Sequence, residues 1–217
     1  MGKDFTADER AVVNKYAARG VADGAVSSCN CNKDVQTKAA CTATLAALSP
    51  NSHNDVFKVH VSKDYMKFNA AHFIAFKGFR EKLHGHNYRL AVTITGQIGP
   101  DGYVVDFGEI KKISRMICKD LNESFLVPMN SDVLKISFDD ASVHILTEDN
   151  ARFSFPKADC SLLPTAHSSA EELASCISNQ LVDALTLSAL RERGVRKLEV
   201  TISEADNQFA SYERTIM

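Results

Sequence analysis

Three histidines in this chain have the spacing of a metal site. His84 and His86 flank one glycine at the start of an alternating segment, and residues two apart on a strand point to the same face. Two imidazoles whose Cα atoms are about 7 Å apart can share one metal ion. His72 closes an upstream segment with strand character, so an antiparallel neighbour would present it opposite the pair. We therefore predict that His72, His84 and His86 bind one metal.

The ligand types favour zinc in a catalytic site. Three neutral imidazoles leave the fourth tetrahedral position of Zn²⁺ open, which is the arrangement of catalytic rather than structural sites. Copper, nickel and iron also accept all-imidazole ligand sets, so zinc follows from ligand type and expected geometry. A bare pair of histidines on an exposed strand is the alternative, and the third histidine argues against it.

Length and composition limit the class of protein. A chain of 217 residues with a net charge of −2 has no general attraction for nucleic acid or an anionic membrane. No apolar run approaches the ~18 residues of a membrane span, and the N-terminus lacks an apolar signal-peptide core. We predict a cytoplasmic protein, with organellar targeting left open.

The six cysteines form no C-x-x-C pair, so we expect reduced thiols; Cys29 and Cys31 could instead form a soft-metal or redox site.

The chain divides near residue 54. Residues 1–54 are rich in small and polar residues and predict a flexible N-terminal extension, while residues 55–217 predict one catalytic domain. Strand patterns over 56–61, 66–73 and 89–97 precede a helix that begins at Asp106, a predicted N-cap.

The second half of the domain is predicted to contain a β segment, a helix and two final strands. An extra β segment of about 30 residues, predicted as a β-hairpin insertion, precedes a second helix that opens with a capping box at residues 168–171. Two strands, over 197–203 and 209–215, end the chain. This order predicts an α+β fold with two helices on one face of a sheet.

These motifs together resemble the 6-pyruvoyl-tetrahydropterin synthase family, which includes 6-carboxytetrahydropterin synthases. The resemblance covers roughly residues 55–217 and rests on motifs in the right order, at residues 68–72, 84–88, 105–107, 168–171 and 203–207. It implies a tunnelling fold, with a four-stranded antiparallel sheet and two helices on one face. It also implies a homo-oligomer, a hexamer built as a dimer of trimers.

The resemblance also implies roles for individual residues. The zinc ligands of the family correspond to His72, His84 and His86. Its pterin-anchoring glutamate corresponds to Glu204, and its pterin-contacting hydroxyls to Ser168 and Ser169. The implied substrate is a small molecule, 7,8-dihydroneopterin triphosphate. A carboxylate can accept two N–H bonds from the 2-amino-4-oxo pyrimidine of a pterin; without the other motifs, Glu204 would be a solvated turn residue.

The catalytic residues depart from the usual family pattern. Ordinary members carry a cysteine a few residues before the paired histidines, and here Glu81 is the nearest acid–base group. This resembles a subgroup in which glutamate replaces the cysteine. The usual Asp-His pair after the first helix is replaced by Asn122 and Glu123, so Glu123 or His167 would have to supply the proton relay. Glu81 as an exposed loop residue, and His167 as a residue that only precedes the helix, are the alternatives.

The leading prediction is a zinc-dependent lyase that cleaves the side chain of dihydroneopterin triphosphate and yields 6-hydroxymethyl-7,8-dihydropterin for folate synthesis, with Glu81 as acid and base. The alternatives are 6-pyruvoyl-tetrahydropterin synthesis, by triphosphate elimination on the route to tetrahydrobiopterin, and a pterin-binding protein without catalysis. Lys77, Arg80 and Lys82 could meet the triphosphate or remain solvated.

Overall fold

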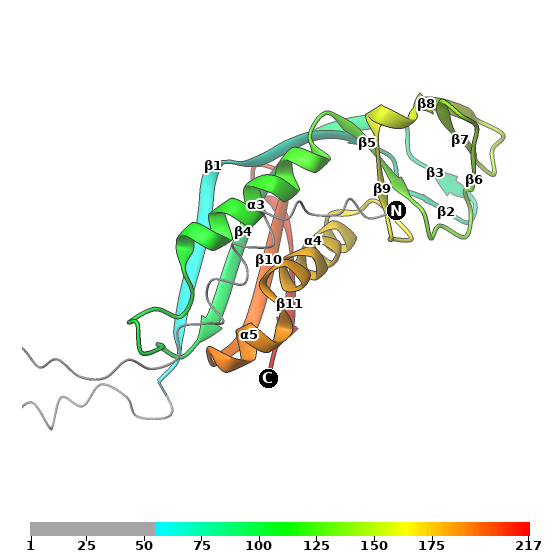
Figure 1. Ribbon diagram of the computed structural model, residues 1–217. Coiled ribbons are helices and arrows are strands. Elements are labelled where there is room, and N and C mark those ends of the chain that lie inside the picture. Colours follow the sequence, from blue (N-terminus) through cyan, green and yellow to red (C-terminus); the bar gives the residue numbers. More distant parts are fainter. Residues whose placement is uncertain (1–54) are drawn as a thin grey trace, which may run out of the picture. The chain divides into compact units, whose positions relative to one another are not determined.

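Two long antiparallel strands carry the three histidines. In the computed structural model, which describes residues 55–217, β1 (Phe57–His72) pairs with β4 (His84–Gly96) over most of their length (Figure 1). The two predicted segments 56–61 and 66–73 are one strand, whose pairing with β4 shifts between Ser62 and Lys67. The extension predicted for residues 1–54 lies outside the described part of the chain.

Among the other described elements, one α-helix follows β4 and two consecutive α-helices precede the last two strands. In chain order they are β2 (Ala75–Phe76), β3 (Phe79–Arg80), α3 (Phe107–Leu121), β5 (Ser124–Pro128), β6 (Lys135–Phe138), β7 (Ser142–Leu146), β8 (Arg152–Pro156), the 3-10 helix η1 (Lys157–Asp159), β9 (Cys160–Leu163), α4 (Ala170–Leu185), α5 (Leu187–Glu192), β10 (Val195–Ala205) and β11 (Gln208–Thr215).

The main sheet has six strands, not the four that we predicted. Its order is β11-β10-β4-β1-β5-β9. The first four strands form the expected antiparallel sheet, and β5 and β9 extend it in parallel at one end, where Ala70 of β1 lies opposite Ser124. Both added strands are short, and short buried parallel strands lack the alternation that marks a strand in sequence. The α+β class is therefore correct and the strand number was wrong.

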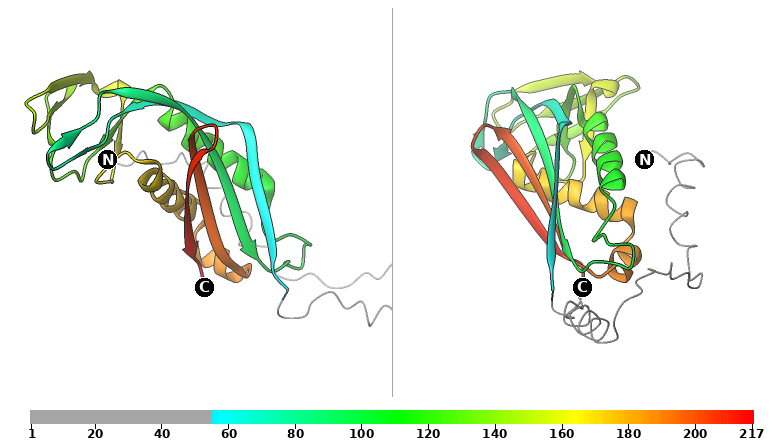
Figure 2. Two further views of the ribbon diagram at one scale, coloured as in Figure 1. Left: turned by 180° about the vertical axis from the view of Figure 1, so that it is seen from behind. Right: turned by 90° about the vertical axis from the view of Figure 1, so that its left-hand side faces the viewer.

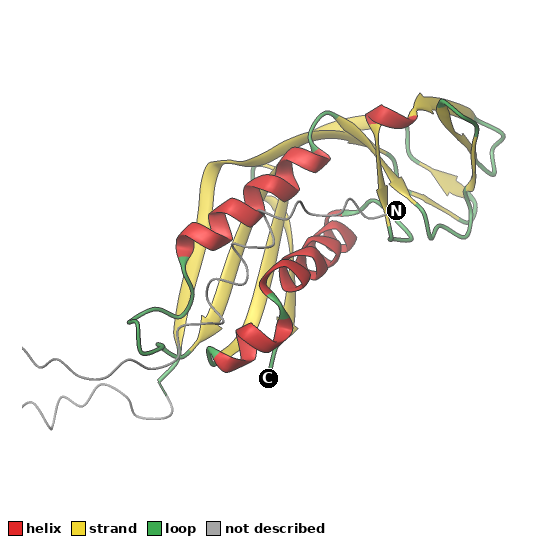
Figure 3. Ribbon diagram, in the orientation of Figure 1, coloured by secondary structure: helices red, strands yellow, loops and turns green. Residues whose placement is uncertain are grey.

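Helices α3 and α4 cover one face of the sheet, as predicted (Figure 3). Asp106 caps α3 by accepting a bond from the Gly108 N–H (2.7 Å). The cap of α4 is Ser169, which accepts from the Glu172 N–H (3.3 Å), so the predicted capping box is displaced by one residue. The helices bury alternate residues of the strands beneath them, among them Leu90, Val92, Ile94, Leu198, Val200 and Ile202. No helix of residues 55–217 covers the opposite face of the sheet (Figure 2).

The predicted hairpin insertion is a three-stranded antiparallel sheet of β6, β7 and β8. A second hydrophobic cluster, which includes Phe73, Phe125 and Val143, joins it to the end of the main sheet beyond His72. Phe73 and Phe153 stack with ring centroids 5.0 Å apart. The insertion thus packs beside the segment that leads from His72 into the β2–β3 hairpin. Within the described residues, no helix is both long and apolar enough to cross a membrane.

Candidate metal centre

The strand register brings the three histidines together. His72, the last residue of β1, lies directly opposite His84, the first residue of β4, and His86 lies opposite Ala70. The three rings have centroids 4.6 to 5.0 Å apart, and one ring nitrogen of each lies within 4.8 Å of the others. The predicted grouping is therefore present, and it is the one metal-capable cluster of histidine, cysteine and carboxylate side chains among the described residues.

Backbone carbonyls fix the orientation of two of these rings. His72 Nδ1 donates to the Ser168 carbonyl (2.9 Å), and His84 Nδ1 donates to the Lys82 carbonyl (2.7 Å). A carbonyl oxygen only accepts, so each Nδ1 carries the proton and each Nε2 keeps a free lone pair. Metal-bound histidines characteristically use the second ring nitrogen in this way.

His72 has the environment of a metal ligand. It is 2% exposed, and its Nε2 is buried without a hydrogen-bond partner. An unpaired buried acceptor costs free energy unless a partner satisfies it, and a cation bound by the triad would do so. Burial lowers the pKa of His72 below its usual value, and the nearby His84 and His86 add to this effect, which favours the neutral, metal-binding imidazole. The donor set therefore fits a metal with borderline softness such as Zn²⁺.

Glu204 is directed at the same site by an irregularity in β10. The pairing of β10 with β11 shifts between Ser203 and Ala205, which leaves Glu204 at a bulge, and bulges commonly re-aim a side chain. The Tyr88 hydroxyl donates to Glu204 Oε1 (3.5 Å). The carboxylate also opposes the lowering of the His72 pKa by burial, so its charge reaches the triad.

Sequence reasoning missed Tyr88 as a member of the site. Its ring packs against those of His72 and His86, with centroids 6.0 and 5.5 Å away. Burial raises the pKa of Tyr88 well above its usual range, and the charges of Glu204 and Glu81 raise it further. The signal was available, since Tyr88 follows His84 and His86 at the same two-residue spacing on β4.

Glu81 lies between the β2–β3 hairpin and His84. The Ile74 N–H donates to Glu81 Oε2 (3.0 Å), and the Glu81 N–H donates to the Ile74 carbonyl (2.9 Å). Ile74 is two residues beyond His72, and the charge of Glu81 acts on Tyr88. These contacts hold the carboxylate near Ile74 and Tyr88, which both adjoin the triad, and its role in catalysis stays a prediction.

The two serines have structural contacts. Ser168 is fully buried, and its hydroxyl donates to the Phe73 carbonyl (3.2 Å) while its own carbonyl holds His72. The Ser169 hydroxyl caps α4. The contact of either hydroxyl with a pterin stays a prediction. In the structure, the Ser168 carbonyl orients the His72 ring.

Glu123 and His167 are not joined to the triad by any hydrogen bond in the described part of the chain. Glu123 is exposed, with φ at 57°, and its N–H donates to the Asn69 carbonyl (2.6 Å). His167 Nδ1 is buried without a partner, one residue from Ser168. A relay through either residue stays a prediction.

Arg80 has partners within the protein. Its guanidinium bonds to both carboxylate oxygens of Asp149, at 2.8 to 3.3 Å, and to the Glu81 carbonyl (2.8 Å). Arg80 is therefore not simply a solvated cation, and its contact with a triphosphate stays a prediction.

The comparison with known proteins accords with this geometry. A family model described as 6-pyruvoyl tetrahydropterin synthase matches residues 60–215, which include all three histidines, both glutamates and Tyr88. The chain belongs to the 6-pyruvoyl tetrahydropterin synthase family. Members of this family are pterin-processing enzymes of the lyase type, and this general activity applies to the present chain.

Two of the relatives below match nearly the whole domain, and one matches a short part of it. A 6-pyruvoyl tetrahydropterin synthase structure from Plasmodium vivax is 45% identical, with a TM-score of 0.72, and covers 75% of this chain and 99% of its own. A second structure of that protein is described as a variant in which alanine replaces a catalytic glutamate. A Methanocaldococcus jannaschii protein named "Putative 6-carboxy-5,6,7,8-tetrahydropterin synthase" is 31% identical over 150 residues, 69% of this chain and 90% of its own. A Pyrococcus furiosus protein named dihydroneopterin monophosphate aldolase is 40% identical over 55 residues, 25% of this chain and 46% of its own.

Proposed function

We propose that this family member is a zinc-dependent lyase that converts 7,8-dihydroneopterin triphosphate to 6-hydroxymethyl-7,8-dihydropterin. The observation that carries the proposal is the position of Glu81, which hydrogen-bonds next to His72 and precedes His84 by three residues. A carboxylate in this place can move a proton to and from the pterin side chain.

The thiols of the described residues support a carboxylate mechanism. Burial raises the pKa of Cys118 to about 12, and it also raises the pKa of Cys160 and Cys176. Thiols of this kind stay protonated near neutral pH and are weak bases and nucleophiles. A glutamate is also the catalytic residue in the description of the P. vivax variant.

The proposed reaction breaks the C1′–C2′ bond of the side chain. Glu81 accepts the proton of the C2′ hydroxyl, and the C2′ oxygen forms a carbonyl as the C1′–C2′ bond breaks, so that C2′ and C3′ leave as glycolaldehyde triphosphate. The electrons of the broken bond pass into the pterin ring, and Glu81 returns the proton to C1′. A zinc ion held by His72, His84 and His86 would polarise the side-chain hydroxyls and lower their pKa. The aldolase name of the P. furiosus relative supports cleavage of a carbon–carbon bond.

Glu204 is proposed to hold the pterin ring. Its carboxylate would accept two N–H bonds from the 2-amino-4-oxo pyrimidine while the neutral Tyr88 hydroxyl donates to it. Ser168 and Ser169 would border the same ring, and Glu123 or His167 would supply a relay where the usual Asp-His pair is missing.

Product analysis tests the proposal. Purified protein with zinc and dihydroneopterin triphosphate should yield 6-hydroxymethyl-7,8-dihydropterin by mass spectrometry, and Glu81→Gln should slow turnover by about 10²–10⁴-fold. Exclusive formation of the pyruvoyl product with a fully active Glu81→Gln variant would contradict it. That result would favour the second candidate, 6-pyruvoyl-tetrahydropterin synthesis, which the name of the P. vivax relative supports.

A pterin-binding protein without catalysis is the remaining alternative. Turnover that needs added zinc and disappears in a folded His84→Ala variant would exclude it. No turnover with any dihydroneopterin phosphate, together with tight pterin binding, would establish it.

We also propose a hexamer made of two trimers. In the described chain the outer edge of β11 and most of one edge of β1 have no partner strand, and such edges readily pair with another copy. Light scattering should give six times the 23.8 kDa chain mass. A monomer at micromolar concentration would contradict the proposal.

A further inference from the structure

The β2–β3 hairpin that leads into Glu81 is very short, and its own pairing consists of two residues on each strand. Phe76 and Phe79 stack on each other at its tip but stay about half exposed. A cavity of about 240 Å³ separates the hairpin from Val133, Leu134 and the turn after β7. Apolar packing alone therefore holds this segment weakly, although a catalytic carboxylate needs a fixed position.

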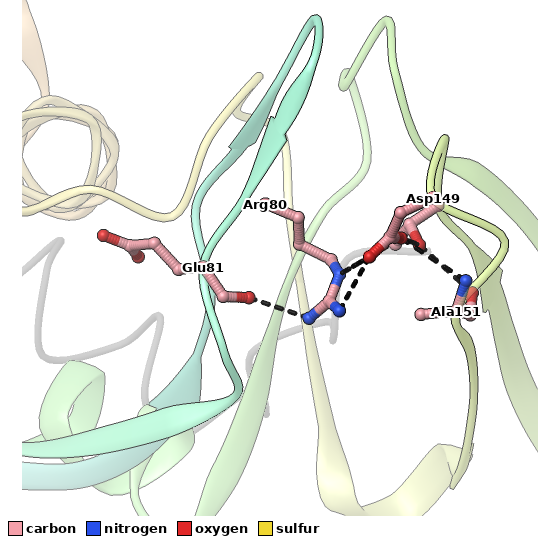
Figure 4. Close-up of polar contacts among 5 residues, drawn as sticks. Arg80, Glu81, Asp149 and Ala151 are labelled. Carbon is pink, nitrogen blue, oxygen red and sulfur yellow. Dashed lines mark hydrogen bonds and ion pairs between the residues drawn. The ribbon is translucent and has the colours of Figure 1, made fainter.

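Arg80 supplies the missing support (Figure 4). Its Nη1 donates to the Glu81 carbonyl (2.8 Å), while Nε and Nη2 donate to Asp149. The planar guanidinium makes these bonds in fixed directions, which a lysine cannot reproduce. Figure 4 shows the Glu81 carboxylate pointing away from Arg80, so the fork contacts the backbone of Glu81 and not its acid group.

The same guanidinium lies on the aromatic cluster beside the triad. Its Cζ is 5.9 Å from the Phe73 ring centroid and 5.5 Å from that of Phe153. Phe73 follows His72 directly, so one cation contacts the segment after a metal ligand and the backbone of the proposed base.

Asp149 is itself fixed in the turn between β7 and β8. Thr147 Oγ1 and the Ala151 N–H both donate to its carboxylate. The Arg80 guanidinium holds the pKa of Asp149 well below its usual range, so the ion pair is formed at neutral pH. The same turn binds the hairpin a second time, where the Gly78 N–H donates to Glu148 Oε2 (2.8 Å).

We propose that Arg80 and Asp149 are positioning residues, and that the three-stranded insertion acts through them to fix Glu81 beside the metal centre. This inference rests on the proposed function of Glu81. It assigns the insertion a role in catalysis that its distance in sequence from the histidines does not suggest.

Asp149→Asn and Arg80→Lys, which change one partner of the ion pair each, test the proposal. Asp101→Asn is a matched control, because Asp101 accepts a similar fork from Arg193 near the far end of β4. Asp149→Asn should lower kcat by roughly 10- to 100-fold, with smaller changes in KM and zinc content unchanged. Arg80→Lys should lower kcat to a similar extent, because a lysine cannot bond to Asp149 and the Glu81 carbonyl in the same geometry. Asp101→Asn should keep wild-type kcat.

Combination with Glu81→Gln separates positioning from general structural support. If the fork acts through Glu81, adding Asp149→Asn to Glu81→Gln should cause no further loss, whereas an independent effect would multiply. A full additional loss in the double variant would overturn the proposal, and so would a wild-type kcat in Asp149→Asn.

Hydrogen exchange provides a readout that does not depend on turnover. Asp149→Asn should speed exchange of the Glu81 N–H, which donates to the Ile74 carbonyl, and of the Ile74 N–H, which donates to the Glu81 carboxylate. Asp101→Asn should change neither rate. Unchanged exchange in Asp149→Asn overturns the positioning role even if Glu81 is catalytic. Faster exchange together with a fully active Glu81→Gln refutes the function proposed for Glu81 but leaves the mechanical link intact.

Discussion

At the scale of single residues, backbone carbonyls decide whether the histidine cluster can bind a metal. The carbonyls of Ser168 and Lys82 hold the Nδ1 protons of His72 and His84, which leaves both Nε2 atoms free. Both are backbone carbonyls, which every residue has, so neither contact depends on the type of side chain. A sequence therefore predicts which residues are ligands but not what orients them.

Removal of one histidine should abolish stoichiometric metal binding. We expect wild-type protein to bind one zinc per chain, and His72→Ala and His84→Ala to lose affinity by more than the ~10–100-fold that loss of an outer hydrogen-bond partner costs. Equilibrium dialysis with metal analysis measures this. His144→Ala is the control, since His144 pairs with Asp139 on the insertion; equal zinc loss in all three variants would contradict the assignment.

Tyr88 should stay protonated until the protein unfolds in alkali. Its folded pKa is raised above the unfolded value of about 10, so its contribution to stability is full below that pH and is lost as the pH rises above it. Titration of tyrosinate absorbance in wild type and Tyr88→Phe tests this. The two should agree before unfolding and differ by one of five tyrosines afterwards; an early difference would refute the prediction.

The site could be predicted from sequence for residues on one strand or on its expected antiparallel neighbour, and not where contacts join segments far apart in the chain. The period of two placed His84 and His86 on one face, and applied once more it would have found Tyr88. Arg80 and Asp149 are 69 residues apart, and no local pattern links them. The Arg80 side chain was therefore assigned to substrate or solvent.

At the scale of elements, alternation and caps predicted the four antiparallel strands and two main helices. The errors concern β5 and β9, whose partners and parallel direction depend on the crossover through α3 and the insertion. Strand pairing of this kind is a tertiary property. The predicted helix start at Asp106 was correct because a cap is local.

Close packing of β4 between its neighbours predicts a cost for Gly96→Ala. A Cβ at this position would lie 2.9 Å from the Gly194 carbonyl oxygen and 3.0 Å from the Val195 Cα, both backbone atoms. The clash should cost about 1–3 kcal/mol, which exceeds the ~0.4–1 kcal/mol gained from a stiffer unfolded chain. Denaturant unfolding at fixed protein concentration measures the difference.

Metal binding is the internal control for this variant. Gly96 ends β4 and His84 begins it, so zinc stoichiometry in Gly96→Ala should match wild type. A free energy of unfolding equal to that of wild type would show that β10 yields to the extra methyl group.

At the scale of the whole molecule, the site combines segments that are distant in sequence. The candidate metal ligands come from the ends of β1 and β4, the carboxylate proposed to hold the pterin comes from β10, and the proposed support of Glu81 comes from the insertion. Histidine spacing predicted the three ligands and the resemblance to a known family predicted Glu204, but neither predicted the contact of the insertion with the segment around Glu81.

Residues 55–217 should therefore be sufficient for metal binding and turnover. The family match spans residues 60–215, and the triad, Glu81, Glu204 and the Arg80–Asp149 fork all lie inside it. A chain of residues 55–217 should bind one zinc, release the same product and assemble to the same number of subunits as the full chain. Zinc analysis, mass spectrometry and light scattering on both chains test this. Loss of assembly with retained zinc would assign residues 1–54 a role in subunit contacts, whereas loss of zinc would contradict the domain boundary near residue 54.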